Sequence, residues 1–578
     1  MRRTKIVATI GPACDTVDQL VKLMQEGMDV ARLNLSHGSV DIHRERIRAI
    51  RYASQVVGRE VGIMLDTRGP EVRIKELAEP MRVSSGDQLR LVRTTDASTR
   101  AAKEIGVTWD GLFDWMVVGT EVLIDDGNLS GRCVEVDADH IVLQMATGGT
   151  IKSRKKINCP GTLWPLHPLD ASDEEAIRMG VEEGIDFVAA SFVHSADDVI
   201  AVRRFIEECG GGLMLIAKIE DRSAVDHLSE VLNVADAVMV ARGDLGVEMP
   251  AEDVPWLQKE IIQQANRRGL PVITATQMLE SMVSASRPTR AETSDVANAI
   301  WDGSDAVMLS AETAAGDYPI ESVKVMARVA ENADHRPQYQ HRVQWDTGRI
   351  ADAVSRASAE IGESLGARAI LTITESGYTA QMVSRCRPKV PIVALSEHQK
   401  VVRRLSLVWG VTSLRMDKPA SDGLVTQAIA TARDAGLVGN EDVVVVTAGF
   451  PQGTPGTTNL LRVETVRGPV VSGQGLGNGA VVTGVVYRWR EGDPMDPPSQ
   501  DFVLLLPYLT TEVIPALEKA CAVVAEQGGL TSDVAIAALS LGRPGIVGAE
   551  DACETLTPGE LVTVDPVRGV VYRGRVSL

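Results

Sequence analysis

Short apolar runs, each followed by a helix-like stretch, recur along the first part of the chain. The runs are rich in aliphatic residues and end at Gly, Pro or polar turns, a pattern typical of buried parallel strands. Strands are expected at residues 4–11, 29–36, 61–69, 186–193, 213–220, 237–244, 271–278 and 306–313. Eight strands that alternate with helices predict an α/β fold built on a (β/α)8 barrel.

One interval in this pattern is too long to be a loop. More than one hundred residues separate the third and fourth strands, whereas the spacing elsewhere is roughly twenty to thirty residues. The interval holds β-like segments separated by turns, namely QLRLVRT, EVLIDDG, CVEVDAD and HIVLQMA. We therefore expect a barrel domain over 1–73 and 162–340, with a small β domain inserted over 74–161.

Two further regions follow the barrel. After the interruption HRPQYQHR, a new α/β alternation contains the expected strands RAILTIT, VPIVALS and DVVVVTAG. A Gly-rich stretch, SGQGLGNGAVVTG, then precedes about one hundred residues with their own strand and turn signals, enough for another domain. The sequence predicts an α/β domain over 341–467 and a terminal domain over 468–578.

Composition restricts the partners and the compartment. The chain carries 59 Lys and Arg against 78 Asp and Glu, a net charge of −19, so nucleic acid is not an expected partner. The seven cysteines are scattered and odd in number, which favours reduced thiols in the cytoplasm. No apolar run approaches the roughly twenty residues that cross a membrane, and the first residues lack a secretory signal pattern.

Polar residues gather where the predicted strands end, which is where a barrel of this kind carries its functional groups. Any single one could be a solvated turn residue, but six of the eight strands repeat the feature. The residues are Arg32, Asn34, Ser36, His37, Asp66, Thr67, Lys218, Glu220, Arg242, Gly243, Asp244, Thr276, Gln277, Ser310 and Glu312.

Two carboxylates in this set, Glu220 and Asp244, suit Mg²⁺, which binds one or two carboxylates and fills its other positions with water and substrate oxygens. A pair of exposed acids is the alternative. Lys218 precedes Glu220 by two residues and so lies on the same side of the strand. A cation beside a metal can stabilise charge on a phosphoryl group in transfer.

A second set offers only oxygen ligands and one formal negative charge, which suits a monovalent cation better than another divalent metal. It comprises Asn34, Ser36, Asp66 and Thr67.

With these residues in view, the chain resembles the pyruvate kinase family over residues 1 to about 467. The similar segments occur in the family's order and are TKIVATIGPAC, GMDVARLNLSHG, LDTRGPEVR, IAKIED, VMVARGDLGVE, ATQMLESM, RPTRAETSDVANAIWDGSDAVMLSAETAAGDYP and LSLVWGV. Their length and colinearity make them far more specific than a lone GxGxxG. The resemblance implies that the phosphoryl group of phosphoenolpyruvate passes to ADP, giving pyruvate and ATP in glycolysis.

The resemblance also implies roles for individual residues. Arg32 and Lys218 would contact the transferring phosphoryl group. The backbone around Gly243 and Asp244 would bind the substrate carboxylate together with Thr276, where the route of a proton to the enolate carbon would begin. These cations would offset the repulsion between two anionic substrates.

Ion and nucleotide sites follow from the same resemblance. Mg²⁺ would be held by Glu220 and Asp244. The K⁺ ligands would be Asn34, Ser36, Asp66 and Thr67, and Glu71 favours K⁺ dependence. The nucleotide would contact His37, Arg73 and Lys155, and the inserted domain would close as a lid.

Three positions depart from the family pattern without touching this core set. Arg68 stands where Lys is usual, His194 where a basic residue such as Arg is common, and Lys156 replaces the usual Gly before Ile157.

The segment TITESGYTA, at 372–380, resembles the family's effector phosphate loop. A hydroxyl-rich turn after a strand can bind phosphate through backbone N–H groups. The resemblance implies a phosphorylated allosteric effector, with contacts from Thr374, Ser376, Gly377 and Thr379. The alternative is an ordinary turn whose hydroxyls cap the next helix.

The last segment resembles the swivelling phosphohistidine domain of phosphoenolpyruvate-utilising enzymes through AEQGGLTSDVAIAALSLGRPGIVG and VTVDPVRGVVYRG. The position of the phosphorylated histidine holds Asp533, so we expect a structural or regulatory module, with a phosphoryl carrier as the alternative. A dikinase-like enzyme would need His at position 533 and a nucleotide-grasp domain. A catalytically silent sensor would have lost one of Lys218, Glu220, Asp244 or Thr276. The family resemblance also implies a homotetramer.

Overall fold

The computed structural model describes residues 2–93, 103–162, 164–339, 348–417, 423–450, 457–466, 468–477, 481–490, 492, 497–498 and 501–575. The chain forms two units, of which the first comprises 1–360, 372–415 and 447–460 and the second comprises 361–371, 416–446 and 461–578. The domain boundaries expected after residues 340 and 467 fall on positions outside the described residues.

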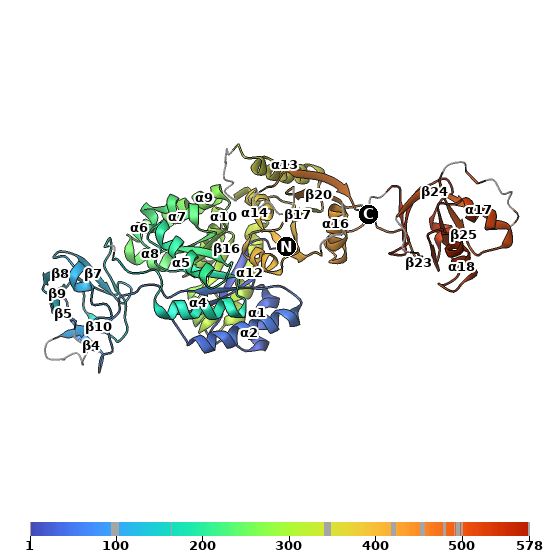
Figure 1. The fold of residues 1–578 in the computed structure, drawn as a ribbon. Coiled ribbons are helices and arrows are strands. Elements are labelled where there is room, and N and C mark those ends of the chain that lie inside the picture. The colour runs from blue at the N-terminus through green and yellow to red at the C-terminus, as the bar shows by residue number, and fades with distance from the viewer. Residues whose placement is uncertain are drawn as a thin grey trace. The chain divides into compact units, whose positions relative to one another are not determined.

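Eight parallel strands close into the predicted barrel in the order β1-β16-β15-β14-β13-β12-β3-β2, and helices surround them (Figure 1). The α/β fold class is therefore confirmed. The strands are β1 (Lys5–Thr9), β2 (Val30–Asn34), β3 (Gly62–Asp66), β12 (Phe187–Ala190), β13 (Met214–Ile219), β14 (Ala237–Ala241), β15 (Val272–Ala275) and β16 (Ala306–Leu309).

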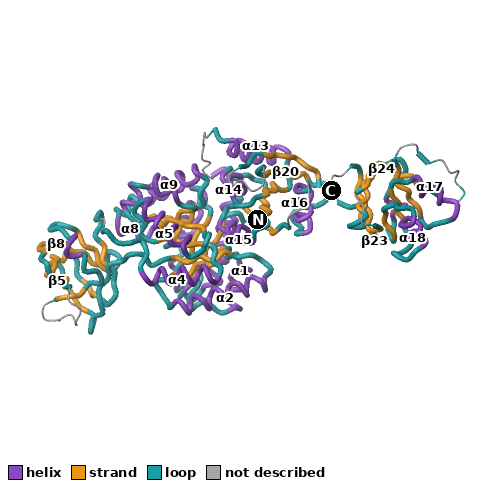
Figure 2. Tube along the Cα trace, in the orientation of Figure 1, coloured by secondary structure: helices purple, strands orange, loops and turns teal. Residues whose placement is uncertain are grey.

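The barrel strands are apolar on both faces because each face is covered. Successive side chains point to opposite sides, so Val7 and Met64 pack together with other inward-facing residues, while Ile6 and Ile63 pack in the larger core against the helices. Each such buried aliphatic side chain contributes about 1.5–3 kcal/mol. Figure 2 shows the strands enclosed by the helices.

Cap residues fix the ends of the barrel helices. Thr16 and Gln19 form a capping box at the start of α1, and Thr289 and Glu292 do so at α10. The helices are α1 (Val17–Glu26), α2 (Val40–Val57), α4 (Ala171–Glu183), α5 (Ala196–Glu208), α6 (Arg222–Asp226), α7 (Leu228–Val234), α8 (Arg242–Glu248), α9 (Val254–Arg268), α10 (Arg290–Asp302), α11 (Ala311–Ala314) and α12 (Pro319–Asp334).

The long interval between β3 and β12 folds as a β structure of its own, while these two strands pair directly in the barrel. A six-stranded sheet has the order β11-β7-β8-β9-β5-β6, and β10 pairs with β4. The elements are β4 (Met81–Val83), β5 (Gln88–Val92), β6 (Glu104–Gly106), α3 (Leu112–Trp115), β7 (Glu121–Ile124), β8 (Leu129–Val136), β9 (His140–Met145), β10 (Gly149–Ile151) and β11 (Ile157–Asn158). Thr94, the last residue of the predicted QLRLVRT segment, lies outside the described residues.

The region after the barrel alternates helices and strands as expected, and β18 pairs in parallel with β19. Its elements are α13 (Ile350–Leu365), β17 (Ala369–Ile373), α14 (Tyr378–Arg385), β18 (Ile392–Ser396), α15 (Gln399–Arg404), β19 (Val411–Arg415), α16 (Leu424–Asp434), β20 (Val443–Ala448) and β21 (Leu460–Thr465).

The end of the chain forms an eight-stranded sheet with the order β22-β29-β28-β24-β25-β26-β27-β23. Leu504 and Val523 pack in the core on one face, and Val503 and Val524 pack on the other. The elements are β22 (Val471–Ser472), β23 (Gln474–Leu476), β24 (Val482–Arg488), β25 (Phe502–Leu506), α17 (Ile514–Lys519), β26 (Ala522–Ala525), α18 (Asp533–Ser540), β27 (Gly545–Val547), α19 (Ala552–Thr555), β28 (Leu561–Asp565) and β29 (Val570–Arg573).

Two simpler findings bear on the composition. All seven cysteines are free thiols. Among the described residues, no helix has the length and apolar character needed to span a bilayer.

Candidate active site

Four predicted site residues meet at the carboxyl ends of β2, β3 and β13. Arg32 donates through Nε to Asp66 Oδ2 at 2.6 Å, and Lys218 Nζ lies 3.0 Å from Asp66 Oδ1. Lys218 Nζ also lies 2.9 Å from Glu220 Oε1, as expected for residues two apart on one strand. Asp66 thus holds two cations side by side, and all four residues are buried.

The electrostatics of this cluster are dominated by burial and by mutual pairing. Burial would raise the pKa of Asp66, but the charges of Arg32 and Lys218 outweigh it and keep that pKa below its ordinary value. Burial would lower the pKa of Lys218, but the carboxylates of Asp66 and Glu220 raise it above its ordinary value. Lys218 therefore remains charged at neutral pH.

Ser191, which directly follows β12, supports the cluster from below. Its hydroxyl accepts a 2.6 Å hydrogen bond from Lys218 Nζ and donates to the carbonyl oxygen of Thr67 at 2.6 Å. The next residue, Phe192, has a positive φ of 52°, and its N–H donates to Glu220 Oε2 at 2.7 Å. The turn after β12 thus positions both the lysine and the carboxylate.

The turn after β15 carries a strained threonine. Thr276 has a φ of 66°, an unfavourable conformation for a β-branched residue. Its hydroxyl accepts from the N–H of Gly243 at 2.8 Å, and its carbonyl oxygen accepts from Arg242 Nη2 at 2.7 Å. Arg242 is fixed in turn by Asp295, 2.7 Å away.

Two predicted strands run into helices in the structure. In the segment 306–313, β16 ends at Leu309 and α11 begins at Ala311. The segment 237–244 was expected to be a strand, but β14 ends at Ala241 and α8 begins at Arg242. Gly243 and Asp244 therefore lie in the first turn of a helix, where backbone N–H groups are free of intrahelical partners. This arrangement can bind an anionic group such as a carboxylate.

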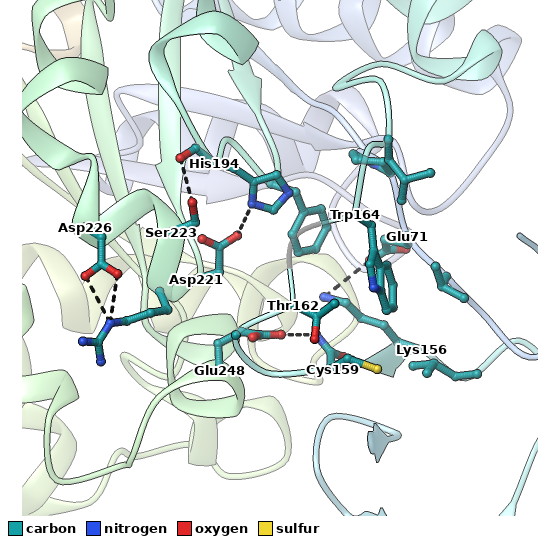
Figure 3. Close-up of a pocket in the computed structure, with 18 of the residues that line it drawn as sticks. Glu71, Lys156, Cys159, Thr162, Trp164, His194, Asp221, Ser223, Asp226 and Glu248 are labelled. Carbon is teal, nitrogen blue, oxygen red and sulfur yellow. Dashed lines mark hydrogen bonds and ion pairs between the residues drawn. The ribbon is translucent and has the colours of Figure 1, made fainter. Parts of the chain in front are cut away.

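Asp244 contacts a lysine from the inserted domain. Lys156 Nζ lies 3.2 Å from Asp244 Oδ1 and 3.8 Å from Glu71 Oε1. The ammonium also stands 4.1 Å from the centre of the Phe192 ring. Figure 3 shows Lys156 and Glu71 beside a cavity of about 200 Å³ that Trp164 and Glu248 also line.

Glu220 and Asp244 fit the ligand set of Mg²⁺. Burial raises the pKa of Glu220 to about 7; Lys218 opposes this shift, and the charge of Asp244 adds to it. A divalent cation would offset the repulsion between the buried Glu220 and the partly exposed Asp244.

The four residues expected to bind K⁺ lie on adjoining segments. Asn34 ends β2 opposite Asp66 at the end of β3, and Asn34 Oδ1 accepts from the N–H of Ser36 at 3.1 Å. The hydroxyl of Thr67 accepts from the N–H of Ser191 at 3.0 Å. Their oxygens fit a low-charge cation, and those of Asn34, Asp66 and Thr67 also bond to protein groups.

The three residues expected at the nucleotide contact residues other than those of the buried cluster. His37 is exposed after β2, and its carbonyl oxygen lies 2.9 Å from His43 Nε2. Arg73 pairs with Glu71 at 2.5 Å. Lys155 pairs with Asp125 of the inserted domain at 2.6 Å.

The predicted effector loop is a compact turn between β17 and α14. The Thr374 hydroxyl accepts from the N–H of Gly377 at 2.9 Å, and Gly377 has a φ of 95°. Thr379 Oγ1 lies 3.0 Å from Thr458 Oγ1, and Ser376 is exposed. The Thr374 hydroxyl thus stabilises the turn, and the hydroxyl of the exposed Ser376 accepts a long 3.5 Å bond from the N–H of Tyr378.

Sequence reasoning missed two site residues, Ser191 and Lys156. The signal for Ser191 was its place at the end of the fourth strand, where the polar pattern of the other strand ends continues. Lys156 was noted only as a departure from a Gly, because no sequence pattern says that a side chain of the inserted domain reaches α8.

Comparisons with known proteins agree with this geometry. Residues 1–323 match the family model for the pyruvate kinase barrel domain, 352–464 that for the pyruvate kinase alpha/beta domain, and 498–569 that for the mobile domain of PEP-utilising enzymes. Curated relatives named pyruvate kinase occur in Bacillus licheniformis and Geobacillus stearothermophilus, each 43% identical, and in Sporosarcina psychrophila, 40% identical. Each alignment covers 100% of both chains.

Proposed function

Because the chain belongs to the pyruvate kinase family of phosphotransferases, we propose that it transfers the phosphoryl group of phosphoenolpyruvate to ADP in glycolysis. The observation that carries this proposal is the buried pairing of Arg32 and Lys218 on Asp66, beside Glu220. Cations that are fixed before the reaction in a site shielded from water stabilise the charge that develops on a transferring phosphoryl group.

Each residue then has a defined task. Arg32 and Lys218 bind the phosphoryl oxygens, and the first turn of α8, at Gly243 and Asp244, binds the substrate carboxylate. Once the phosphoryl group leaves, the remaining enolate takes a proton along a route that begins at the Thr276 hydroxyl. The strained backbone of Thr276 fixes that hydroxyl in place.

Metal ions and the nucleotide complete the site. Glu220 and Asp244 would hold Mg²⁺, which supplies charge neutralisation between the two anionic substrates when it is bound. Asn34, Ser36, Asp66 and Thr67 would hold K⁺. ADP would lie against the inserted domain, with contacts from His37, Arg73 and Lys155, and the domain would act as a lid.

Both rival functions conflict with the residues that the sequence contains. A carrier role for the terminal domain needs a nucleophile, and the histidine position holds Asp533 at the first residue of α18. A silent sensor needs a damaged site, whereas Lys218, Glu220, Asp244 and Thr276 are all present. We infer that the terminal domain is a structural or regulatory module.

Regulation and assembly extend the same proposal. The turn at 374–379 would bind a phosphorylated activator through its outward Ser376 and its backbone N–H groups. The enzyme would act in the cytoplasm as a homotetramer, which sedimentation of the purified protein tests.

A lactate-dehydrogenase-coupled assay of pyruvate formation from phosphoenolpyruvate and ADP tests the function. We expect turnover that requires Mg²⁺ and rises with K⁺. At low substrate concentration, a sugar phosphate or nucleotide from a panel should increase this turnover. Absence of turnover with both ions, across the whole panel, would refute the kinase activity. Turnover that no panel member changes would refute only the activation.

A further inference from the structure

Lys156 is a buried cation of the inserted domain that points at the barrel. Its backbone is held on both sides, because it bridges to Arg73 in antiparallel register and its carbonyl oxygen accepts from the N–H of Asp125 at 3.1 Å. Only 9% of the residue is exposed. The main chain therefore determines where the side chain goes.

The ammonium of Lys156 lies beside the Asp244 carboxylate and provides a positive charge next to it. It lies 3.2 Å from Asp244 Oδ1, on a carboxylate whose side chain is 34% exposed. On its other side Glu71 Oε1 is 3.8 Å away, and the ring of Phe192 lies beneath it. The charge of Lys156 also opposes the effect of burial, which raises the pKa of the neighbouring carboxylates Glu220 and Glu248.

We propose that Lys156 is an internal counter-ion of the metal site, which neutralises Asp244 in the metal-free enzyme and must leave it when a divalent cation binds. An ammonium and a metal compete for the same carboxylate oxygens, so the ion pair weakens metal binding. Glu71 and Phe192 offer the displaced ammonium a second position beside the site. This inference rests on the proposed assignment of Glu220 and Asp244 as metal ligands.

Direct titration with Mn²⁺, followed by the electron paramagnetic resonance signal of the free ion, tests the competition without substrates. We expect Lys156→Gln to bind Mn²⁺ about fivefold more tightly than the wild type, the size of one partly exposed ion pair. Lys156→Arg keeps the charge and should stay within about twofold of the wild type. Lys152→Gln, which removes the same charge from an exposed position nearby, should also remain within about twofold.

The outcomes separate this inference from the metal assignment. Equal or weaker Mn²⁺ binding by Lys156→Gln would overturn the counter-ion role, as would equal tightening by Lys152→Gln or Lys156→Arg. If Lys156→Gln fails to fold, Lys156→Met takes its place, because its apolar stem preserves the packing on Phe192. Wild-type binding by Glu220→Gln would instead refute the metal site itself.

Discussion

Replacing Ser191 with Ala removes the hydrogen-bond acceptor that holds Lys218 from below. Ser191 is 2% exposed. Its hydroxyl accepts a hydrogen bond from Lys218 Nζ and donates one to the carbonyl oxygen of Thr67, each at 2.6 Å. Alanine fits the space but leaves that carbonyl without this donor. Among the described residues, the ammonium then keeps Asp66 and Glu220 as partners. Lys218 then has greater freedom to turn away from the phosphoryl group.

The expected loss follows from the charge on the donor. A hydrogen bond to a charged group contributes about 1.5–3 kcal/mol, and each 1.4 kcal/mol corresponds to a tenfold change in rate. Because two carboxylates still hold Lys218, we expect the lower end, a fall in kcat of about tenfold. The KM for phosphoenolpyruvate should change less than about threefold, since the substitution leaves the proposed carboxylate site at α8 unaltered.

Steady-state kinetics of Ser191→Ala in the coupled assay measure both constants. Ser322→Ala is a matched control, because it removes a buried hydroxyl that donates to the Tyr318 carbonyl at 2.8 Å in α12. The control should lose stability but keep kcat. A kcat of Ser191→Ala within twofold of the wild type, with Lys218 still required, would refute the positioning role.

Three other predictions follow from separate parts of the molecule. Glu220→Gln should lose at least about a thousandfold of the Mg²⁺-dependent activity, and unchanged kinetics would contradict the metal assignment. Asp29 is buried against Arg2 at 2.7 Å and Arg59 at 2.8 Å; burial raises its pKa, but these cations outweigh that effect and lower the pKa below its ordinary value. Its stabilisation is therefore present above the unfolded-state pKa of about 3.9 and is lost as the pH falls through the lower folded-state pKa. Asp29→Asn should cost about 2 kcal/mol in urea unfolding at pH 7 and progressively less in acid, and a cost that does not shrink in acid would contradict this pairing. Truncation after residue 470 should leave the transfer reaction intact, because the eight strands of the terminal sheet, β22 to β29, all follow that residue. Loss of transfer in a folded truncated protein would instead indicate a catalytic role for this domain.

The fold could be predicted from the sequence because barrel strands form distinct apolar runs. β1, β2 and β3 are buried on both faces, so their sequences are mostly apolar, and the polar residues and glycines at or after their ends mark where they stop. The end of β14 was placed too late because the predicted strand included Arg242, Gly243 and Asp244, which form the first turn of α8. In the structure, Arg242 contacts Asp295 and the Thr276 carbonyl oxygen at the point where α8 begins.

The site could be predicted from the sequence only where the carboxyl ends of parallel strands bring residues together. The meeting of Arg32, Asp66, Lys218 and Glu220 follows from strand order in a parallel barrel, and the structure places them in contact. Lys156 belongs to a domain inserted after β3, whereas Asp244 lies in a helix after β14. No local sequence pattern predicts that these two residues come into contact. Ser191 was missed because its role depends on the positive φ of the following Phe192 and the turn it creates.

Transfer of label from phosphoenolpyruvate carrying ³²P to ADP tests the central claim most directly. The account predicts labelled ATP from the wild type with Mg²⁺ and K⁺, at least about a thousandfold less from Lys218→Met, and no labelled protein. Label retained on the terminal domain, undiminished transfer by Lys218→Met, or no labelled ATP from the wild type would contradict it.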